Sequence, residues 1–268
     1  MYFIIMLPGL NFEGRCRKPI TAPTVLTKSL AEEIGIHIGD GCLCLRKKAG
    51  HYDYFVCLHR DEEDYKDYVI ALIRHLYGIA PSHVDKDEIE KSVALEYNSR
   101  MLFEFKKMLG LPIGNKKDVV IPEFVEDSEF VLDCVRGIFD MDGSLTFKKK
   151  YRNRHYYPVI KIDNKNPALI LQVERILLSV GIKSFTQLDR PMLASNGSLS
   201  NMSTVFISGK KRLEKFLYIV SPKNENHISK YRIWKKFGFC PPKTTLEERR
   251  KILQGTLNPE NFYAGGGI

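Results

Sequence analysis

The stretch VRGIFDMDGSLTF, residues 135–147, contains an acidic pair, Asp140 and Asp142, directly before a glycine. The apolar residues that lead into the pair recur at helical spacing and do not alternate as in a strand; they are Phe130, Val131, Cys134, Val135, Ile138 and Phe139. We therefore predict a helix over residues 128–143 with Asp142 in its last turn. The negative end of the helix dipole disfavours an acid there, so this carboxylate is a candidate for function rather than for stability.

The first part of the chain contains an equivalent segment, SLAEEIGIHIGDG, residues 29–41. Ser29 and Glu32 fit a helix-capping box, and the predicted helix ends at Asp40, which a glycine follows. After each aspartate the pattern predicts two strands, a helix, a further strand and another helix, in that order. This repetition indicates the duplication of one half-domain.

The predicted elements divide the chain into two similar parts. In the first part we expect strands over 42–48, 52–60 and 90–99 and helices over 61–79 and 100–111. In the second part we expect strands over 144–150, 155–163 and 203–209 and helices over 166–182 and 210–220. The domain boundaries are then an N-terminal arm over 1–28, a first repeat over 29–115, a linker over 116–129, a second repeat over 130–240, and a tail with one short helix over 241–268.

Glycines predict how the two aspartates meet. Gly35 and Gly137 each lie five residues before an aspartate, and Gly39 lies on the same helix as Gly35. If the two helices pack along these glycines, Asp40 and Asp142 converge at one end. Adjacent carboxylates repel each other unless a cation lies between them. Oxygen ligands favour Mg²⁺, which Mn²⁺ or Ca²⁺ can replace for binding, and such a metal supports phosphodiester hydrolysis.

Two other chemistries use similar letters. FDMDGSL is close to the motif of haloacid-dehalogenase-type phosphatases, in which the first Asp attacks phosphate. That family needs its Asp at the end of a strand and a later acidic pair, and it would not use Asp40, so it is the weaker alternative. A calcium loop starting at Asp140 is disfavoured because Tyr151 stands where the closing Glu belongs.

The segments EIGIHIGDG (33–41) and VRGIFDMDG (135–143) resemble the two motifs of a single-chain LAGLIDADG homing endonuclease of the archaeal, intron-encoded type. The resemblance covers roughly residues 29 to 236. It implies an α/β (α+β) fold of two pseudo-symmetric αββαββα repeats, with saddle-shaped antiparallel sheets and a central pair of packed helices. It also implies that Asp40 and Asp142 are catalytic and hold the metal. Ile38 replaces the acid at the motif's sixth position, whereas Asp140 retains it, and Met141 stands where a small residue is usual.

The charge distribution predicts double-stranded DNA as the partner. The chain has a net charge of +9 and a pI of about 9.1, and residues 144–161 contain six basic residues and no acid. Such a hairpin is either a solvated charged loop or a surface that neutralises phosphates and reads bases in the major groove. The predicted DNA-binding residues are Arg46, Lys47, Lys48, His59, Arg60, Lys148, Lys149, Lys150, Arg152, Arg154, Lys161 and Asn164.

The resemblance also implies helper residues. A basic residue is expected near each active site at the start of the helix that follows the last strand of each repeat. The sequence register gives Arg100 and Lys211 for these positions, with Lys210 as a rival for Lys211. A polar residue at the end of the second strand, His59 or Asn164, is expected to organise water.

We therefore predict a monomeric, intron-encoded endonuclease that cuts both strands of a long, pseudo-palindromic DNA site. The alternative is a relative that binds nucleic acid without cutting it, such as an RNA maturase. The six cysteines lack zinc-ligand spacing, which favours reduced thiols in the cytoplasm. No apolar run approaches the ~20 residues of a membrane helix, so no membrane partner is expected.

Overall fold

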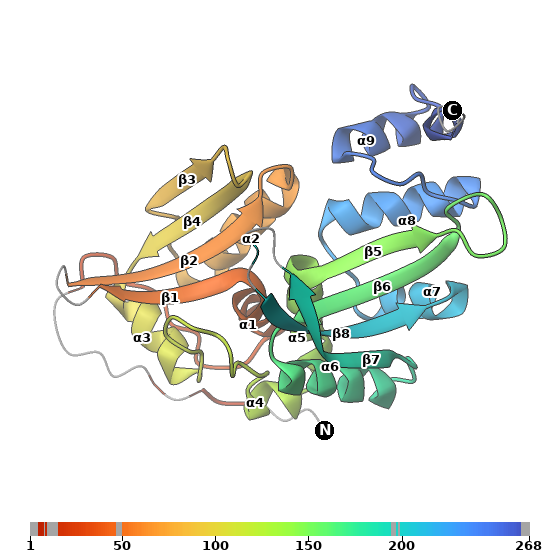
Figure 1. The fold of residues 1–268 in the computed structure, drawn as a ribbon. Coiled ribbons are helices and arrows are strands. Elements are labelled where there is room, and N and C mark those ends of the chain that lie inside the picture. Colours follow the sequence, from red (N-terminus) through yellow and green to blue (C-terminus); the bar gives the residue numbers. More distant parts are fainter. Residues whose placement is uncertain are drawn as a thin grey trace.

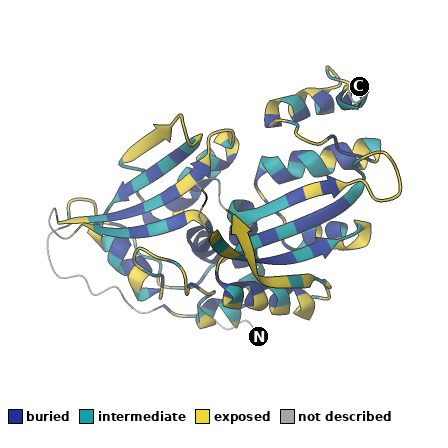
Figure 2. Ribbon diagram, viewed as in Figure 1, coloured by how far each residue is buried: buried dark blue, intermediate teal, exposed yellow. Residues whose placement is uncertain are grey.

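The computed structural model describes residues 5–7, 9, 16–46, 50–193, 197 and 199–263. Two four-stranded antiparallel sheets lie next to each other, and helices cover one side of each sheet (Figure 1). We call the other side, which no described helix covers, the open face. In Figure 2 the exposed residues concentrate on the outer strands, and the buried ones follow the inner strands and the central helices. The predicted fold class, two repeats with antiparallel sheets around a central helix pair, is confirmed.

The described elements of the first repeat are α1 (Lys28–Asp40), β1 (Gly41–Arg46), β2 (His51–His59), α2 (Glu63–Tyr77), β3 (His83–Asp87), β4 (Ser92–Asn98) and α3 (Arg100–Met108). The short α4 (Glu123–Glu126) precedes the second repeat. This repeat contains α5 (Val131–Asp142), β5 (Gly143–Lys148), β6 (Tyr157–Asn164), α6 (Pro167–Ser179), β7 (Phe185–Leu193), β8 (Leu199–Ser208) and α7 (Lys210–Ile219). The remaining elements are α8 (Glu225–Phe237), α9 (Leu246–Gln254) and a 3-10 turn over Pro259–Phe262.

The two sheets have the same topology and the same register relative to their aspartates. The strand orders are β1-β2-β4-β3 and β5-β6-β8-β7. Gly41, which follows Asp40, pairs with Val56, and Gly143, which follows Asp142, pairs with Ile162. Positions in the two repeats can therefore be matched by counting along the strands from these pairs.

The sequence analysis did not assign the outer strands β3 and β7. Every residue of β3 is exposed, and β7 is exposed over nearly its whole length. A strand at the edge of a sheet with neither side buried lacks the alternation of apolar and polar residues that identifies strands. These strands form because β4 and β8 offer them backbone partners.

The central helices α1 and α5 touch backbone to backbone at their glycines. A Cβ atom on Gly35 would lie 2.1 Å from the carbonyl oxygen of Cys134, and one on Gly137 would lie 2.2 Å from that of Glu32. Farther along, a Cβ on Gly39 would lie 2.5 Å from the Cβ of Met141. The missing side chains thus make this contact possible.

Ion pairs fix the same helices at the end away from the aspartates. The guanidinium of Arg136 on α5 donates to Glu32 on α1 at 2.7 Å and to Asp133 on its own helix at 2.6 Å. Arg136 and Glu32 are largely shielded from water, with 11% and 4% of their side chains exposed. Charge-assisted bonds between shielded groups hold the two helices in one register.

The C-terminal segment connects the two repeats. Asn224 and Asn226 at the start of α8 both donate to the carboxylate of Glu62 in the first repeat, at 2.9 and 2.8 Å. The short helix expected in the tail is α9, which a capping box between Thr245 and Glu248 initiates. In the part of the chain that the structure describes, no helix has both the length and the apolar character needed to cross a bilayer.

We predict that Gly137→Ala destabilises the protein by about 3 kcal/mol or more, at or beyond the upper end of typical overpacking penalties, because the new methyl group forces two helix backbones apart. The free energy of unfolding, measured by urea denaturation, tests this. Gly9→Ala is the matched control, since a Cβ there meets no atom within 4 Å. Equal stability of the Gly137→Ala variant and the wild type would show that the helix contact is looser than described.

Candidate functional site

Asp40 and Asp142 converge where α1 and α5 end, between the two sheets. A Cβ on Gly39, the residue before Asp40, would lie 3.8 Å from the carboxyl carbon of Asp142. The two carboxyl groups also interact electrostatically, since the charge of Asp40 raises the pKa of Asp142. The structure therefore brings together the two acids that were paired from the sequence.

This site disfavours two negative charges. Burial, followed by the charge of Asp40, raises the pKa of Asp142 from 3.8 to about 7. Burial also raises the pKa of Asp40, and the nearby Glu62 adds to the effect. Asp142 is half-buried, and Asp40 is exposed. The pair is thus open on one side, where a ligand can reach it.

The donor set fits a hard divalent cation. Two half-enclosed carboxylates that repel each other are relieved by a cation between them. Among the described residues no group of three or more His, Cys, Asp or Glu side chains forms a complete metal cage. Mg²⁺ suits such a site because it is commonly held by one or two carboxylates and completes its shell with water and substrate phosphate oxygens.

Lys116 is a cation at this site that the sequence analysis did not select. Its ammonium donates to the carbonyl oxygen of Gly39 and, at 3.3 Å, to that of Ile38. It therefore caps the C-terminal end of α1, and its charge lowers the pKa of both Asp40 and Asp142. It was missed because it lies in a segment that was interpreted only as a linker.

Asn164 lies beside Asp142, whereas His59 does not occupy the matching place in the first repeat. The amide of Asn164 donates to Asp142 Oδ2 at 3.1 Å. Counting from Ile162 and Val56 makes Leu58 the counterpart of Asn164, so His59 falls one residue later. There the His59 ring accepts from the backbone of Asp61 at 3.2 Å.

The structure does not bring Arg100 or Lys211 to the aspartates. Arg100 lies over the ring of Tyr52 at 5.0 Å, and Tyr52 pairs with Leu45, roughly 13 Å along the strand from Gly41. Lys211 follows β8, whose last residue, Ser208, pairs with Val159. Asn164, which contacts Asp142, pairs with Ser203 at the opposite end of β8. The reason is topological: the last strand of each repeat runs antiparallel to the second strand and carries the next helix to the far end of the sheet.

Asp140 has a structural place. Only 1% of the residue is exposed, and its carboxylate accepts from the backbone N–H groups of Lys223 and Asn224 at 2.7 and 3.3 Å, ahead of α8. Both oxygens of the carboxylate are therefore engaged in hydrogen bonds to the backbone. Asp140 also lies within helix α5 rather than at the end of a strand. This geometry is incompatible with the nucleophile of a haloacid-dehalogenase-type phosphatase, so that alternative is wrong. The calcium loop also fails, because Gly143–Lys148 forms a strand.

The predicted DNA-binding residues separate into groups. Lys148, Lys149 and Lys150 line a groove on the open face of the second sheet. Lys161 contacts Phe206 on that face. Arg152 lies over the exposed side of the hairpin, 5.5 Å from the ring of Tyr156.

Other predicted contacts are engaged within the protein. Arg154 pairs with Glu260 at 2.6 Å and lies over the ring of Phe239, so it faces the C-terminal segment rather than the open face. Arg60 pairs with Glu88. On the first sheet, Arg46 is within 3.5 Å of Asp53. Lys47 and Lys48 lie outside the described residues.

Comparisons with known proteins agree with this architecture. Residues 129–220 match the family model of the LAGLIDADG-like domain. Meganuclease I-SmaMI, bound to uncleaveable DNA with a TTCT central four, is 11% identical, with a TM-score of 0.51 over 88% of this chain and 97% of that chain. LAGLIDADG homing endonuclease I-GzeII, in complex with a DNA target, is 6% identical, with a TM-score of 0.51 over 87% and 94%.

The structure of I-DmoI in complex with DNA and Mn is 22% identical, with a TM-score of 0.49 over 74% of this chain and 98% of that chain. No curated protein sequence matches. The chain thus carries a LAGLIDADG-like domain in its second repeat, on the fold of the two-repeat LAGLIDADG meganucleases.

We predict a pH-dependent gain in stability for Asp142→Asn in the presence of a chelator. The folded-state pKa of Asp142, about 7, lies above its ordinary value of 3.8. Ionisation therefore costs stability, and this cost grows as the pH rises from about 4 to 7. Asparagine removes it, so the variant is expected to exceed the wild type by on the order of 2 kcal/mol near pH 8 and to equal it near pH 4. Urea denaturation across this pH range measures the difference.

Asp67→Asn, on the exposed surface of α2, is the control and should leave the pH profile unchanged. A stability difference that is the same at both ends of the pH range would contradict the placement of Asp142 beside a second carboxylate.

Proposed function

We propose that the protein is a monomeric, metal-dependent endonuclease that cuts both strands of a long, pseudo-palindromic DNA site, and that it is intron-encoded. The observation that carries this proposal is the pair Asp40 and Asp142, held together at the junction of two equivalent sheets. A pair at a two-fold junction supplies one carboxylate for each strand of a duplex.

The open faces support duplex DNA as the substrate. Each sheet presents a two-stranded ribbon extended by further strands, and such a ribbon fits the major groove. Lysines line the open face of the second sheet and neutralise phosphates. The aspartates lie between the two faces, so a duplex that crosses both would pass its central phosphates over the carboxylates. The I-SmaMI and I-GzeII structures are also complexes with DNA.

Asp40 and Asp142 are the residues that would hold a divalent cation, Mg²⁺ first and Mn²⁺ or Ca²⁺ as substitutes for binding. When bound, the metal would polarise the phosphodiester and make a water molecule more acidic. The chain's own contribution is to hold the two carboxylates rigidly, because helix ends fixed by a backbone contact leave them little freedom. Asn164 further orients the carboxylate of Asp142 through its 3.1 Å hydrogen bond.

Lys116 supplies the positive charge that was first sought at Arg100 and Lys211. Its ammonium lies against the last turn of α1, and its charge acts on both Asp40 and Asp142. A cation at this point stabilises negative charge that develops on a phosphate between the carboxylates. Its bonds to the α1 carbonyls also keep it in place before DNA arrives.

The decisive experiment incubates the protein and Mg²⁺ with the uninterrupted form of the host gene. A single staggered double-strand break is expected. Binding to this DNA without any break, in Mg²⁺ and Mn²⁺ alike, would instead assign the chain to the non-cleaving relatives, of which RNA maturases are an example.

We predict that Asp40→Asn and Asp142→Asn each abolish double-strand cleavage and leave DNA affinity within about threefold, a change below 1 kcal/mol. The amide keeps the shape of the carboxylate but loses the charge that attracts the metal. Plasmid cleavage and gel-shift titration in Ca²⁺ measure the two properties. Loss of binding together with cleavage would mean that the acids are structural.

For Lys116→Met we predict a fall in the single-turnover cleavage rate of about 100-fold, as for the removal of one electrostatic stabiliser. DNA affinity should change little, and the melting temperature should fall only slightly, because methionine retains the aliphatic stem and loses only the bonds of the ammonium to the α1 carbonyls. The adjacent, exposed Lys117→Met is the matched control and should cleave at the wild-type rate. A drop in melting temperature with an unchanged rate would restrict Lys116 to capping α1.

A further inference from the structure

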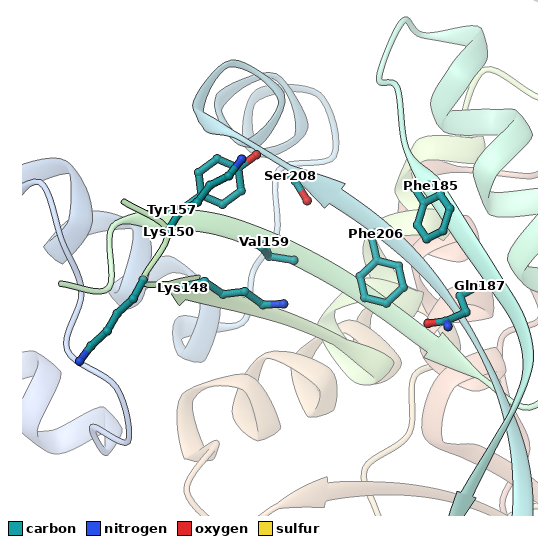
Figure 3. A pocket seen from close by; sticks show the side chains of 9 residues that line it. Lys148, Lys150, Tyr157, Val159, Phe185, Gln187, Phe206 and Ser208 are labelled. Carbon is teal, nitrogen blue, oxygen red and sulfur yellow. The ribbon is translucent and has the colours of Figure 1, made fainter. Parts of the chain in front are cut away.

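An apolar groove lies on the open face of the second sheet. Tyr157, Val159, Phe185 and Phe206 form its apolar walls, and its volume is about 380 Å³ (Figure 3). The rings of Phe185 and Phe206 lie 6.1 Å apart, and 66% of Phe185 is exposed. Tyr157 and Phe206 are half-buried and Val159 is buried, so Phe185 carries most of the exposed apolar surface. A contiguous apolar patch of this kind marks a candidate binding surface.

The strand register places this groove beside the aspartate pair. Phe206 pairs with Lys161, and Lys161 pairs with Ser144, two residues after Asp142. Val159 and Ser208 pair two positions farther outward, on the same face of the sheet. The groove therefore spans positions a few residues away from the site at which the proposed function places the centre of the DNA.

The equivalent positions of the first repeat are polar. Counting from Val56 and Ile162, the counterpart of Val159 is Asp53, and the counterpart of Phe206 is Glu96. Phe185, which pairs with Phe206, corresponds to His83, which pairs with Glu96. Two repeats with the same backbone thus present opposite chemistry at matched places.

The polar set in the first repeat forms a connected network. Asn98 donates to Asp53 at 2.6 Å and to Glu96 at 2.9 Å, and Arg46 lies 3.5 Å from Asp53. Asp53 is fully buried within this network, so Arg46 and the partly exposed Asn98 and Glu96 are the groups that offer hydrogen-bond donors and acceptors to a partner. The groove of the second repeat offers mainly hydrocarbon, so the two faces cannot prefer the same base edges.

Resting on the proposed function, we infer that the second sheet docks the 5-methyl groups of thymine, and that the half-site beneath it is thymine-rich. Within the major groove the methyl group of thymine is the apolar feature of the four standard bases, and apolar side chains contact it. Phe185, Val159 and Phe206 form a surface on which such methyl groups lose contact with water. The first sheet reads its half-site through hydrogen bonds instead.

Charge complementarity selects DNA over an apolar protein segment as the occupant. Lys148, Lys149 and Lys150 line the same groove, and the ammonium of Lys161 lies 5.3 Å from the Phe206 ring. An apolar core within a rim of lysines matches the base edges and the flanking phosphates of a duplex. A purely apolar partner would leave those charges without counterions.

The test begins with duplexes selected from a random-sequence library for binding in Ca²⁺. A selected duplex is then resynthesised with deoxyuridine for thymidine in one half at a time, which removes only the methyl groups. Substitution in one half should weaken binding about fourfold for each contacted methyl group, the factor expected for burying one carbon group. Substitution in the other half should leave the dissociation constant unchanged.

Phe185→Ser identifies the responsible surface without disturbing the core, since Phe185 is mostly exposed. The variant should lose part or all of the preference for thymine over uracil. Tyr218→Ser, which removes an aromatic ring that is 87% exposed on α7, is the matched control and should keep it. Circular dichroism melting verifies that both variants are folded.

Equal binding of the thymine and uracil duplexes in both halves would overturn the inference and leave the proposed function standing. Failure to bind any duplex would instead overturn the proposed function together with this inference. If sedimentation shows a dimer that Phe185→Ser dissociates, the groove belongs to a second copy of the chain, which also overturns the assignment to thymine.

Discussion

The contact between α1 and α5 is the constraint on which the rest of the structure depends. The helices meet at a separation that excludes even a methyl group at Gly35 and Gly137. Because the two helices end at the same place, the carboxylates of Asp40 and Asp142 lie close together although their negative charges repel each other. Packing and the shielded bonds from Arg136 to Glu32 and Asp133 offset this repulsion in the folded state. A divalent cation between the two carboxylates would relieve the repulsion that remains, so binding of such a cation would also stabilise the fold.

The contact between α1 and α5 also determines where each sheet begins. A strand starts directly after each aspartate, so the register of β1 and β5 is measured from the helix ends. The repeats then diverge wherever this geometry permits. Asp140 binds the backbone ahead of α8, whereas the corresponding Ile38 is fully buried in the core. Two repeats with one backbone plan therefore differ in how their helix ends connect to the remaining chain.

The sequence predicted what local periodicity and spacing encode. The central helices, their glycines and both aspartates follow from residues 29–41 and 135–143 alone. The outer strands β3 and β7 could not be predicted, because they are exposed on both sides and therefore lack the alternation of apolar and polar residues that identifies a strand. Arg100 and Lys211 were selected by their place in the order of elements, without the strand direction that carries them away from Asp40 and Asp142. Lys116 carries no local signal, since its position at the end of α1 arises only from the path of the folded chain.

The arrangement separates a constrained centre from variable surfaces. At the helix contact a substitution must fit between backbones, so few residues are allowed. On the open faces no described helix covers the side chains, so a substitution there does not have to fit between two helix backbones. The pair Val159 and Asp53 illustrates the consequence, because equivalent positions carry an apolar group in one repeat and a carboxylate in the other. Changes of this kind alter the chemistry of one sheet while the contact between the central helices stays fixed, so the open face of one repeat can change independently of the other repeat and of the central site.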